Sequence, residues 1–264
     1  MKRIIVSIII PSFNTKEVTL RCVKSIVENT SFSYEIIVVD NGSTDGSVKQ
    51  ITNLKLIANS NNLGFARAVN QGIKVARGRY LLLLNSDVFT NKGSIEKMID
   101  FAKKTPDCGV VGGKLVFGNG KTQHSVMVFP TLWQTIAKYW LRRKDPVLPR
   151  DVAVVDAVVG AAFLITPEAI SRIGVLDERY FMYFEDLDYC RRVKKAGLKT
   201  YYLPEAEFTH LHGESGKGLS SSENQWRRLV PSSQIYHGIL IHYLIILIMW
   251  TSQKVRKLFG LLSS

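Results

Sequence analysis

The chain has 264 residues, of which 46% are hydrophobic and 22% charged, a balance typical of a folded globular protein and not of a disordered one. The 35 Lys and Arg residues against 22 Asp and Glu give a net charge of +13, which favours anionic partners. No helix-turn-helix, zinc-finger or RNA-recognition pattern accompanies these basic residues, so we expect no nucleic-acid partner. The three cysteines form no CxxC pair, which argues against a disulfide framework or zinc site and fits a reducing compartment.

The N-terminal half alternates between patterns typical of buried strands and patterns typical of helices. Strands are predicted at residues 4–10, 34–39, 54–58 and 80–84, and helices at residues 15–28 and 64–77. Continuous runs of β-branched and aliphatic residues are typical of parallel strands buried on both faces. The alternation predicts βαβ units, and therefore a Rossmann-like α/β fold whose mostly parallel central sheet is flanked by helices.

The second half is less regular. Strand character occurs at residues 110–117, 152–165 (interrupted at 160–162) and 200–203, and a helix is predicted at residues 185–196. The last of these strands is expected to end at Pro204. Since no repeat or low-complexity linker divides the chain, we predict one domain over residues 1–215 and a C-terminal helical tail over residues 216–264.

Polar clusters follow three of the predicted strands, at residues 11–14, 40–45 and 85–87. In open α/β sheets, ligands bind in the crevice beyond the carboxyl ends of the strands. One such cluster is explained as an Asx-rich turn with a helix cap, but three together favour a binding site. Asp40 is the candidate acceptor for a nucleobase or ribose. Asp87 is the candidate oxygen ligand for Mg²⁺ or Mn²⁺ bridging a diphosphate.

Three basic side chains have two interpretations each. Arg67 lies where a loop enters a helix, so it belongs either to a simple helix start or to a diphosphate site at the helix N-terminus. His210 and His212 are either packed polar residues or ligands of the suspected metal.

An acidic cluster at residues 185–188 follows an aromatic stretch at residues 180–184. Acids at a helix N-terminus are stabilised by the helix dipole, which is the simplest interpretation of Glu185 and Asp188. Aromatic surroundings also raise the pKa of a carboxyl group by desolvation and suit it to general-base catalysis. Asp186 is the candidate for that role.

Taken in order, these motifs resemble the GT-A glycosyltransferases of family 2, in particular the bacterial rhamnosyltransferase-like branch. The matching stretches are SIIIPSFN (7–14), EIIVVDNGSTDGS (35–47), NLGFARAVN (62–70), RGRYLLLLNSD (77–87), Gly160-Ala161, GVLDERYFMYFEDLDYCR (174–191) and PEAEFTHLHGES (204–215). Each motif is weak alone, and their order makes the set specific.

The resemblance implies a role for each candidate residue. It places Pro11, Asn14, Asp40, Asp45, Arg67, Asn85 and Ser86 at the nucleotide-sugar site. Asp87 is the implied metal ligand of a DxD-type motif, with His210 preferred over His212 as its companion and Mg²⁺ or Mn²⁺ as the cofactor. Asn85 stands where other members have the first Asp, as is common in this branch. Asp186 is the implied catalytic base, with Glu185 beside it.

The resemblance also implies the reaction. An inverting transfer moves a hexose, rhamnose-like or other, from a dTDP- or UDP-sugar donor to a hydroxyl of a glycan or lipid-linked acceptor. A sugar-nucleotide nucleotidyltransferase is the first alternative, but it would carry a Gly-rich, basic loop after the first strand, where residues 11–14 stand instead. A non-catalytic nucleotide-sugar-binding membrane protein is the second, and the carboxylates of Asp87 and Asp186 argue against it.

The tail is apolar and flanked by basic residues. No Lys, Arg, Asp or Glu occurs between Leu229 and Gln253, and residues 239–250 are apolar apart from His242. This run is shorter than the about 20 residues needed to span a bilayer. Shallow interfacial insertion, a full span and a buried helix all stay open. The first agrees with a peripheral or monotopic enzyme on an anionic membrane surface, at the cytoplasmic face of the cell membrane.

Overall fold

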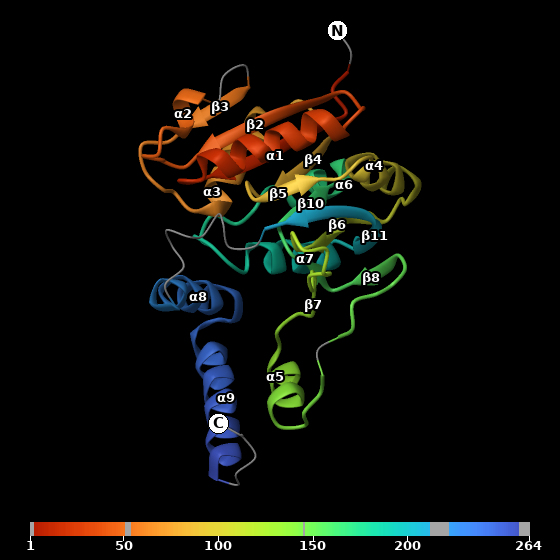
Figure 1. The fold of residues 1–264 in the computed structure, drawn as a ribbon. Coiled ribbons are helices and arrows are strands. Elements are labelled where there is room, and N and C mark those ends of the chain that lie inside the picture. The colour runs from red at the N-terminus through yellow and green to blue at the C-terminus, as the bar shows by residue number, and fades with distance from the viewer. Residues whose placement is uncertain (1–2, 51–53, 145, 212–221, 259–264) are drawn as a thin grey trace.

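A computed structural model describes residues 3–50, 54–144, 146–211 and 222–258. Within these residues the main sheet has nine strands in the order β3-β2-β1-β4-β10-β6-β11-β5, with β8 paired to β11 (Figure 1). The strands before residue 85 are β1 (Val6–Ser12), β2 (Tyr34–Asp40), β3 (Lys55–Ala58) and β4 (Tyr80–Leu84). These four strands are parallel, as predicted.

The remainder of the sheet is mixed. Its strands are β5 (Val88–Thr90), β6 (Cys108–Val116), β8 (Ala153–Val155), β10 (Ala162–Ile165) and β11 (Lys199–His210). β10 runs antiparallel between β4 and β6, whereas β11 is parallel to β6 and antiparallel to β5 and β8. A separate two-stranded sheet pairs β7 (Val126–Met127) with β9 (Ala157–Val158). The predicted α/β class is confirmed, and the parallel arrangement applies to its N-terminal half.

Helices cover both faces of the main sheet (Figure 1). They are α1 (Lys16–Asn29), α2 (Ser47–Gln50), α3 (Phe65–Val75), α4 (Ser94–Lys104), α6 (Pro167–Ile173) and α7 (Glu185–Lys195). In β1, Ile8 and Ile10 belong to the core cluster that contains α1 and α4, and Ile9 belongs to the cluster that contains α3 and α7. Because successive side chains of a strand point to opposite faces, a strand covered on both faces is apolar throughout.

The prediction that the last strand ends at Pro204 is wrong. β11 continues to His210, and its register with β6 shifts between Leu203 and Glu207. A proline has no N–H to donate to the ladder, so a strand tolerates it at such an irregularity. The continuation pairs His210 with Val88 of β5. The extension thereby places a histidine from late in the chain beside Val88, the residue that follows Asp87.

The C-terminal tail is a bent pair of helices, α8 (Ser222–His237) and α9 (Ile239–Leu258). The pair bends by 119° at Gly238, whose φ of +80° suits glycine. No single helix in the described parts of the chain is long and apolar enough to cross a membrane, although this bent pair together meets the criteria of length and composition. The predicted boundary at residues 215 and 216, and His212, lie outside the described residues.

α9 lies side by side with α5 (Leu132–Tyr139), and both project from the same side of the sheet domain (Figure 1). The Ser252 hydroxyl donates to the Tyr139 carbonyl at 2.6 Å, and the Trp140 indole donates to the Ile248 carbonyl at 3.2 Å. The tail therefore packs against the part of the chain between β7 and β8. It leaves much of the apolar surface of α9 exposed.

Candidate active site

Two of the polar strand ends are tied to each other. The backbone N–H of Asn14, whose φ is +53°, donates to the Ser43 hydroxyl at 2.8 Å, and the Asn14 side chain accepts from Thr44 N–H at 2.8 Å. Asp45 accepts from the backbone N–H of Lys16 at 2.9 Å. Asn14 and Asp45 thus hold the β1–α1 and β2–α2 loops together. Both side chains bond to the loops that frame the crevice.

Asp40 is fully buried at the end of β2, with one satisfied and one unsatisfied oxygen. Its Oδ1 accepts from the N–H groups of Gly42 and Ser43, at 3.2 and 2.9 Å. Its Oδ2 is buried and has no hydrogen-bond partner among the described residues. A buried acceptor without a donor lowers the stability by about 1–3 kcal/mol, so a donor from a bound ligand would be favourable here. Pro11, which pairs in register with Val39, lies on the neighbouring strand.

Asn41 organises the loop that enters α3, a role that sequence reasoning missed. Its amide donates to Asn62 Oδ1 and to the Gly64 carbonyl, both at 3.1 Å, and its Oδ1 accepts from Leu63 N–H at 3.2 Å. The signal was available, since Asn41 directly follows Asp40 in the polar cluster. Side-chain amides that bond the backbone of a second loop fix its path.

The start of α3 is bonded to the segment before the acidic cluster. Phe65 N–H donates to the Phe181 carbonyl at 2.7 Å, so this helix-terminal amide is used within the protein. Gly64 has a φ of +89°, and a Cβ there would lie 2.6 Å from the same carbonyl oxygen. Arg67, one turn into the helix, lies 3.8 Å from Glu178 with both side chains about half exposed. Such a pair is weak, which leaves the guanidinium available to an anionic ligand.

The third strand end holds residues 85–87. Asn85 N–H donates to the Ala161 carbonyl at 3.0 Å, which fixes the end of β4 against β10. Ser86 is buried, and its hydroxyl lies 3.2 Å from that of Thr15, as part of a hydroxyl network that joins this loop to α1. The contacts of Ser86 are therefore structural. Asp87 instead faces His210 of β11.

Asp87 and His210 face each other at the sheet edge. The distance between Asp87 Oδ1 and His210 Nε2 is 3.5 Å, and both side chains are buried. Gln123 donates from its amide to the His210 carbonyl at 2.6 Å, so its Oε1 is the atom 2.9 Å from His210 Nδ1. The proton of a neutral ring then resides on Nδ1, and Nε2 presents its lone pair toward the carboxylate. A carboxylate oxygen and an imidazole nitrogen at this separation are both suitable ligands for one divalent cation.

This pair fits a divalent cation held partly by a substrate. No group of three or more His, Cys, Asp or Glu side chains that could hold a metal occurs in the described chain. Mg²⁺ and Mn²⁺ commonly take one or two protein ligands and complete their shell with water and phosphate oxygens. The predicted partners Asp87 and His210 are thus brought together. Gln123, which orients the histidine, lies in an irregular segment where no sequence pattern marked it.

Glu185 and Asp186 begin α7. Asp186 accepts from Gly160 N–H at 3.0 Å and from Leu187 N–H at 2.8 Å. Burial raises the pKa of Asp186, and these hydrogen bonds oppose the increase. Burial, and then the charge of Asp186, raises the pKa of Glu185 to about 8. Glu185 and Asp186 are among the residues that line a small cavity of about 10 Å³, and Glu185 Oε2 has no partner among the described residues.

Asp188, the other acid of the cluster, is structural. It is buried and forms ion pairs with Arg191 at 3.0 Å and with Arg192 at 2.8 Å. The sequence interpretation of Asp188 as a helix-end acid therefore agrees with its contacts. Glu185 departs from that interpretation because it is buried without a basic partner among the described residues.

Comparison with known proteins decides the class. Residues 7–158 match the family model described as "Glycosyl transferase family 2", which is more than half of the chain. The chain belongs to glycosyl transferase family 2. This enzyme is therefore a glycosyltransferase, which sets aside the nucleotidyltransferase and non-catalytic alternatives.

Individual relatives place it near the rhamnosyltransferases. It is 30% identical over 222 residues to the N-acetylglucosaminyl-diphospho-decaprenol L-rhamnosyltransferase of Mycobacterium tuberculosis, covering 74% of this chain and 72% of that protein. It is 26% identical to rhamnosyltransferase WbbL of Escherichia coli K12, with 77% and 84% covered. The solved mannosyltransferase PcManGT of Pyrobaculum calidifontis, in complex with GDP-Man and Mn²⁺, shares the fold: the TM-score is 0.64 at 15% identity, with 98% and 76% covered.

Proposed function

We propose that this glycosyltransferase moves a hexose, rhamnose-like or other, from a dTDP- or UDP-sugar to a hydroxyl of a lipid-linked or polysaccharide acceptor. The observation that carries the proposal is that three groups lie at the same edge of the sheet: Asp40 at the end of β2, the Asp87–His210 pair after β4, and the Glu185–Asp186 pair, which is bonded to Gly160 just before β10. The M. tuberculosis relative, named for a diphospho-decaprenol acceptor, and the E. coli rhamnosyltransferase support the acceptor and sugar class.

The donor half of the site binds the nucleotide. We assign Asp40 Oδ2 to a ribose hydroxyl or base N–H, because a ligand donor there would satisfy its open acceptor. Arg67 turns from its weak pair with Glu178 to the diphosphate. Asp87 and His210 would hold Mg²⁺ or Mn²⁺, which neutralises charge on the diphosphate when bound.

The other half of the site, formed by Glu185 and Asp186, removes the proton of the acceptor hydroxyl. Asp186, fixed by the Gly160 and Leu187 amides, takes the proton of the acceptor hydroxyl as that oxygen bonds to the anomeric carbon. The bond from that carbon to the diphosphate oxygen breaks on the opposite side, so the configuration inverts. Glu185 stays protonated below a pH of about 8, which keeps a second negative charge away from Asp186.

Substitution of the base tests this assignment. Asp186→Asn keeps the shape and removes the basicity, so transfer should fall by about 10²–10⁴-fold. Donor affinity, measured by calorimetry with UDP- and dTDP-sugars, should change less than twofold. Asp100→Asn, on the exposed surface of α4, is the matched control. Transfer within tenfold of the wild type in Asp186→Asn would overturn the role of Asp186. Absence of donor hydrolysis and transfer by the wild type across a nucleotide-sugar panel would overturn the function.

We also propose that the enzyme works as a peripheral protein at the cytoplasmic face of the membrane. Large apolar side chains are exposed on both projecting helices: Trp133 on α5 (62%) and Leu240 and Trp250 on α9 (74% and 54%). The net charge of +13 favours anionic lipid, and the buried free thiols suit a reducing compartment. Leu240→Ser with Trp250→Ser should weaken co-sedimentation with phosphatidylglycerol vesicles, while Val27→Ser on α1 should not; equal binding by both would contradict the assignment.

A further inference from the structure

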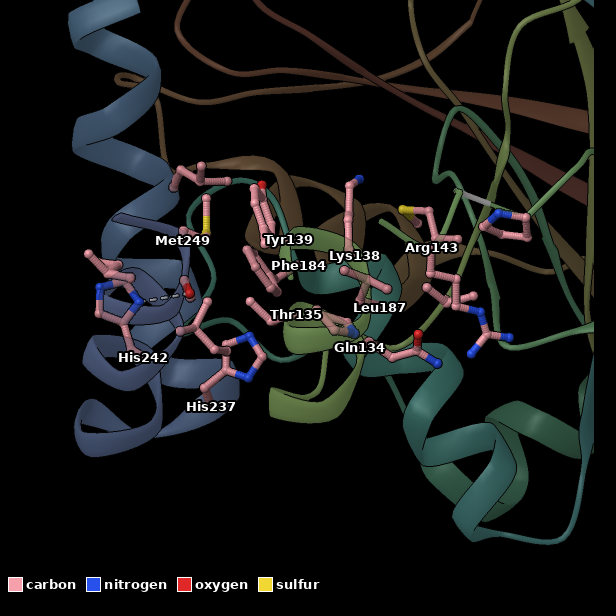
Figure 2. A pocket seen from close by; sticks show the side chains of 18 of the residues that line it. Gln134, Thr135, Lys138, Tyr139, Arg143, Phe184, Leu187, His237, His242 and Met249 are labelled. Atoms are coloured by element: carbon pink, nitrogen blue, oxygen red, sulfur yellow. Dashed lines mark hydrogen bonds between the residues drawn. The ribbon is translucent and has the colours of Figure 1, made fainter. Parts of the chain in front are cut away.

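A large cavity lies between α5, the start of α7 and the C-terminal tail. Its volume is about 840 Å³, within the range of about 300–1,000 Å³ that is usual for ligand sites. Residues from β7, α5, α7, α8 and α9 line it, and Figure 2 shows several of them pointing into the same space. Neither the donor half of the site nor the Asp87–His210 pair contributes to this lining. The cavity therefore offers room for something other than the nucleotide.

The two sides of this cavity differ in chemistry. Leu229 of α8 and Ile245 and Met249 of α9 supply an apolar side. Arg143 and Lys144, in the loop after α5, supply a cationic side. Among the described residues that line the cavity there is no Asp or Glu. An apolar wall together with cationic side chains suits an amphiphile with an anionic head.

The loop that carries the cations is anchored at both ends. Arg143 N–H donates to the Ala137 carbonyl of α5 at 2.9 Å. His124 Nε2 lies 2.7 Å from the Pro146 carbonyl, which ties the far end of the loop to the segment before β7. The backbone of Arg143 is thus fixed against α5, although the side chains of Arg143 and Lys144 are exposed.

The same cavity extends to the start of α7, although Glu185 and Asp186 themselves line a separate small cavity. Phe184 and Leu187 line the large cavity, and Asp186 lies between them in sequence. The Ser232 hydroxyl of α8 donates to the Met182 carbonyl at 2.8 Å, so the tail is fixed to the segment just before the acidic cluster. A ligand seated here would contact Phe184 and Leu187, at the end of α7 that carries the proposed base.

We infer that this cavity holds the acceptor as a long-chain lipid phosphate or diphosphate. Arg143 and Lys144 bind the phosphate head, Leu229, Ile245 and Met249 contact the first part of the chain, and the attached sugar points to Asp186. The inference rests on the proposed function. It adds that the α5 loop and the tail select the acceptor; the tail lies outside residues 7–158, which match the family model. The exposed apolar surfaces of α5 and α9 would let the remaining chain stay in the bilayer.

Direct binding tests the cavity without any knowledge of the donor. Farnesyl diphosphate and farnesol serve as probes, and tryptophan fluorescence of the full chain reports their binding. The variant Arg143→Ala/Lys144→Ala should bind farnesyl diphosphate about tenfold more weakly and farnesol equally well. The matched control Lys103→Ala/Lys104→Ala removes two adjacent cations from α4, away from the cavity, and should bind both probes like the wild type.

The apolar side has its own variant. Met249→Gln should lower the affinity for both probes by several-fold, because the hydrocarbon chain of each probe contacts α9. Excess UDP and dTDP should leave farnesyl diphosphate bound, which separates this cavity from the donor site. Equal affinity of the wild type for farnesyl diphosphate and farnesol would overturn the inference, as would displacement of the probe by either nucleotide. Displacement by phosphatidylglycerol vesicles at matched concentration would assign the cavity to bilayer lipid instead.

Activity separates this inference from the proposed function. If both hold, Arg143→Ala/Lys144→Ala raises the KM for a lipid-diphosphate-linked sugar about tenfold and leaves donor hydrolysis unchanged. Probe binding with no transfer or donor hydrolysis by the wild type would contradict the proposed function alone. Normal transfer by the variant, with an unchanged KM for the lipid-linked acceptor, would contradict the cavity assignment alone.

Discussion

The buried carboxyl group of Glu185 should make the stability of this enzyme depend on pH in an unusual direction. Glu185 is 8% exposed and its Oε2 has no partner among the described residues. Its pKa rises from an ordinary 4.5 to about 8 in the fold, first because of burial and then because of the charge of Asp186. At about 1.4 kcal/mol for each pH unit, this difference corresponds to at most about 5 kcal/mol.

The sign follows from proton binding. Between pH 4.5 and about 8 the folded state keeps a proton on Glu185 that the unfolded state has released. The free energy of unfolding therefore falls as the pH rises through this window, and the loss from this group is complete above a pH of about 8. Glu185→Gln retains the size of the side chain and cannot ionise. When the pH is raised from 5 to 9, the free energy of unfolding of the variant should therefore increase by a few kcal/mol relative to that of the wild type.

Urea unfolding at pH 5 and pH 9, followed by circular dichroism, measures this difference. The slope of the free energy of unfolding against urea concentration should be the same in both proteins, since the substitution does not change the surface that unfolding exposes. Glu17→Gln, whose parent side chain is 79% exposed, is the matched control and should show less than about 0.5 kcal/mol of pH-dependent change. A difference between wild type and Glu185→Gln that is equal at both pH values would refute the argument that burial retains the proton.

Two further predictions concern the supports of the site. Gln123→Leu removes the acceptor that orients His210, so the affinity for Mn²⁺ with bound donor nucleotide, measured by calorimetry, should fall about tenfold; an unchanged affinity would contradict the orienting role. Gly64→Ala places a Cβ 2.6 Å from the Phe181 carbonyl at a φ of +89°, so thermal unfolding should show a loss of about 2 kcal/mol or more. Gly46→Ala, with a φ of +81° and no atom near the added Cβ, should lose only about 1 kcal/mol, and equal losses would show that the contact with Phe181 is unimportant.

The sequence by itself determined the elements and the family. The β-branched run of β1 predicted a strand buried on both faces, and Ile8 and Ile9 do pack into opposite clusters. The polar residues after β1, β2 and β4 predicted one crevice, because parallel strands end at the same edge of a sheet. Such features depend on neighbours within a few residues, and periodicity and turn chemistry are encoded at that range.

Only the tertiary structure decided how distant segments meet. β11 passes Pro204 because its shifted register with β6 accommodates the missing donor, and His210 reaches Asp87 through that extension. The side chain of Gln123, from a third segment of the chain, bonds both the carbonyl and the ring of His210. α5 and α9 enclose a cavity that neither helix forms alone, with Arg143 at its cationic side. These arrangements depend on pairings between residues far apart in sequence, and local patterns carry no information about such pairings.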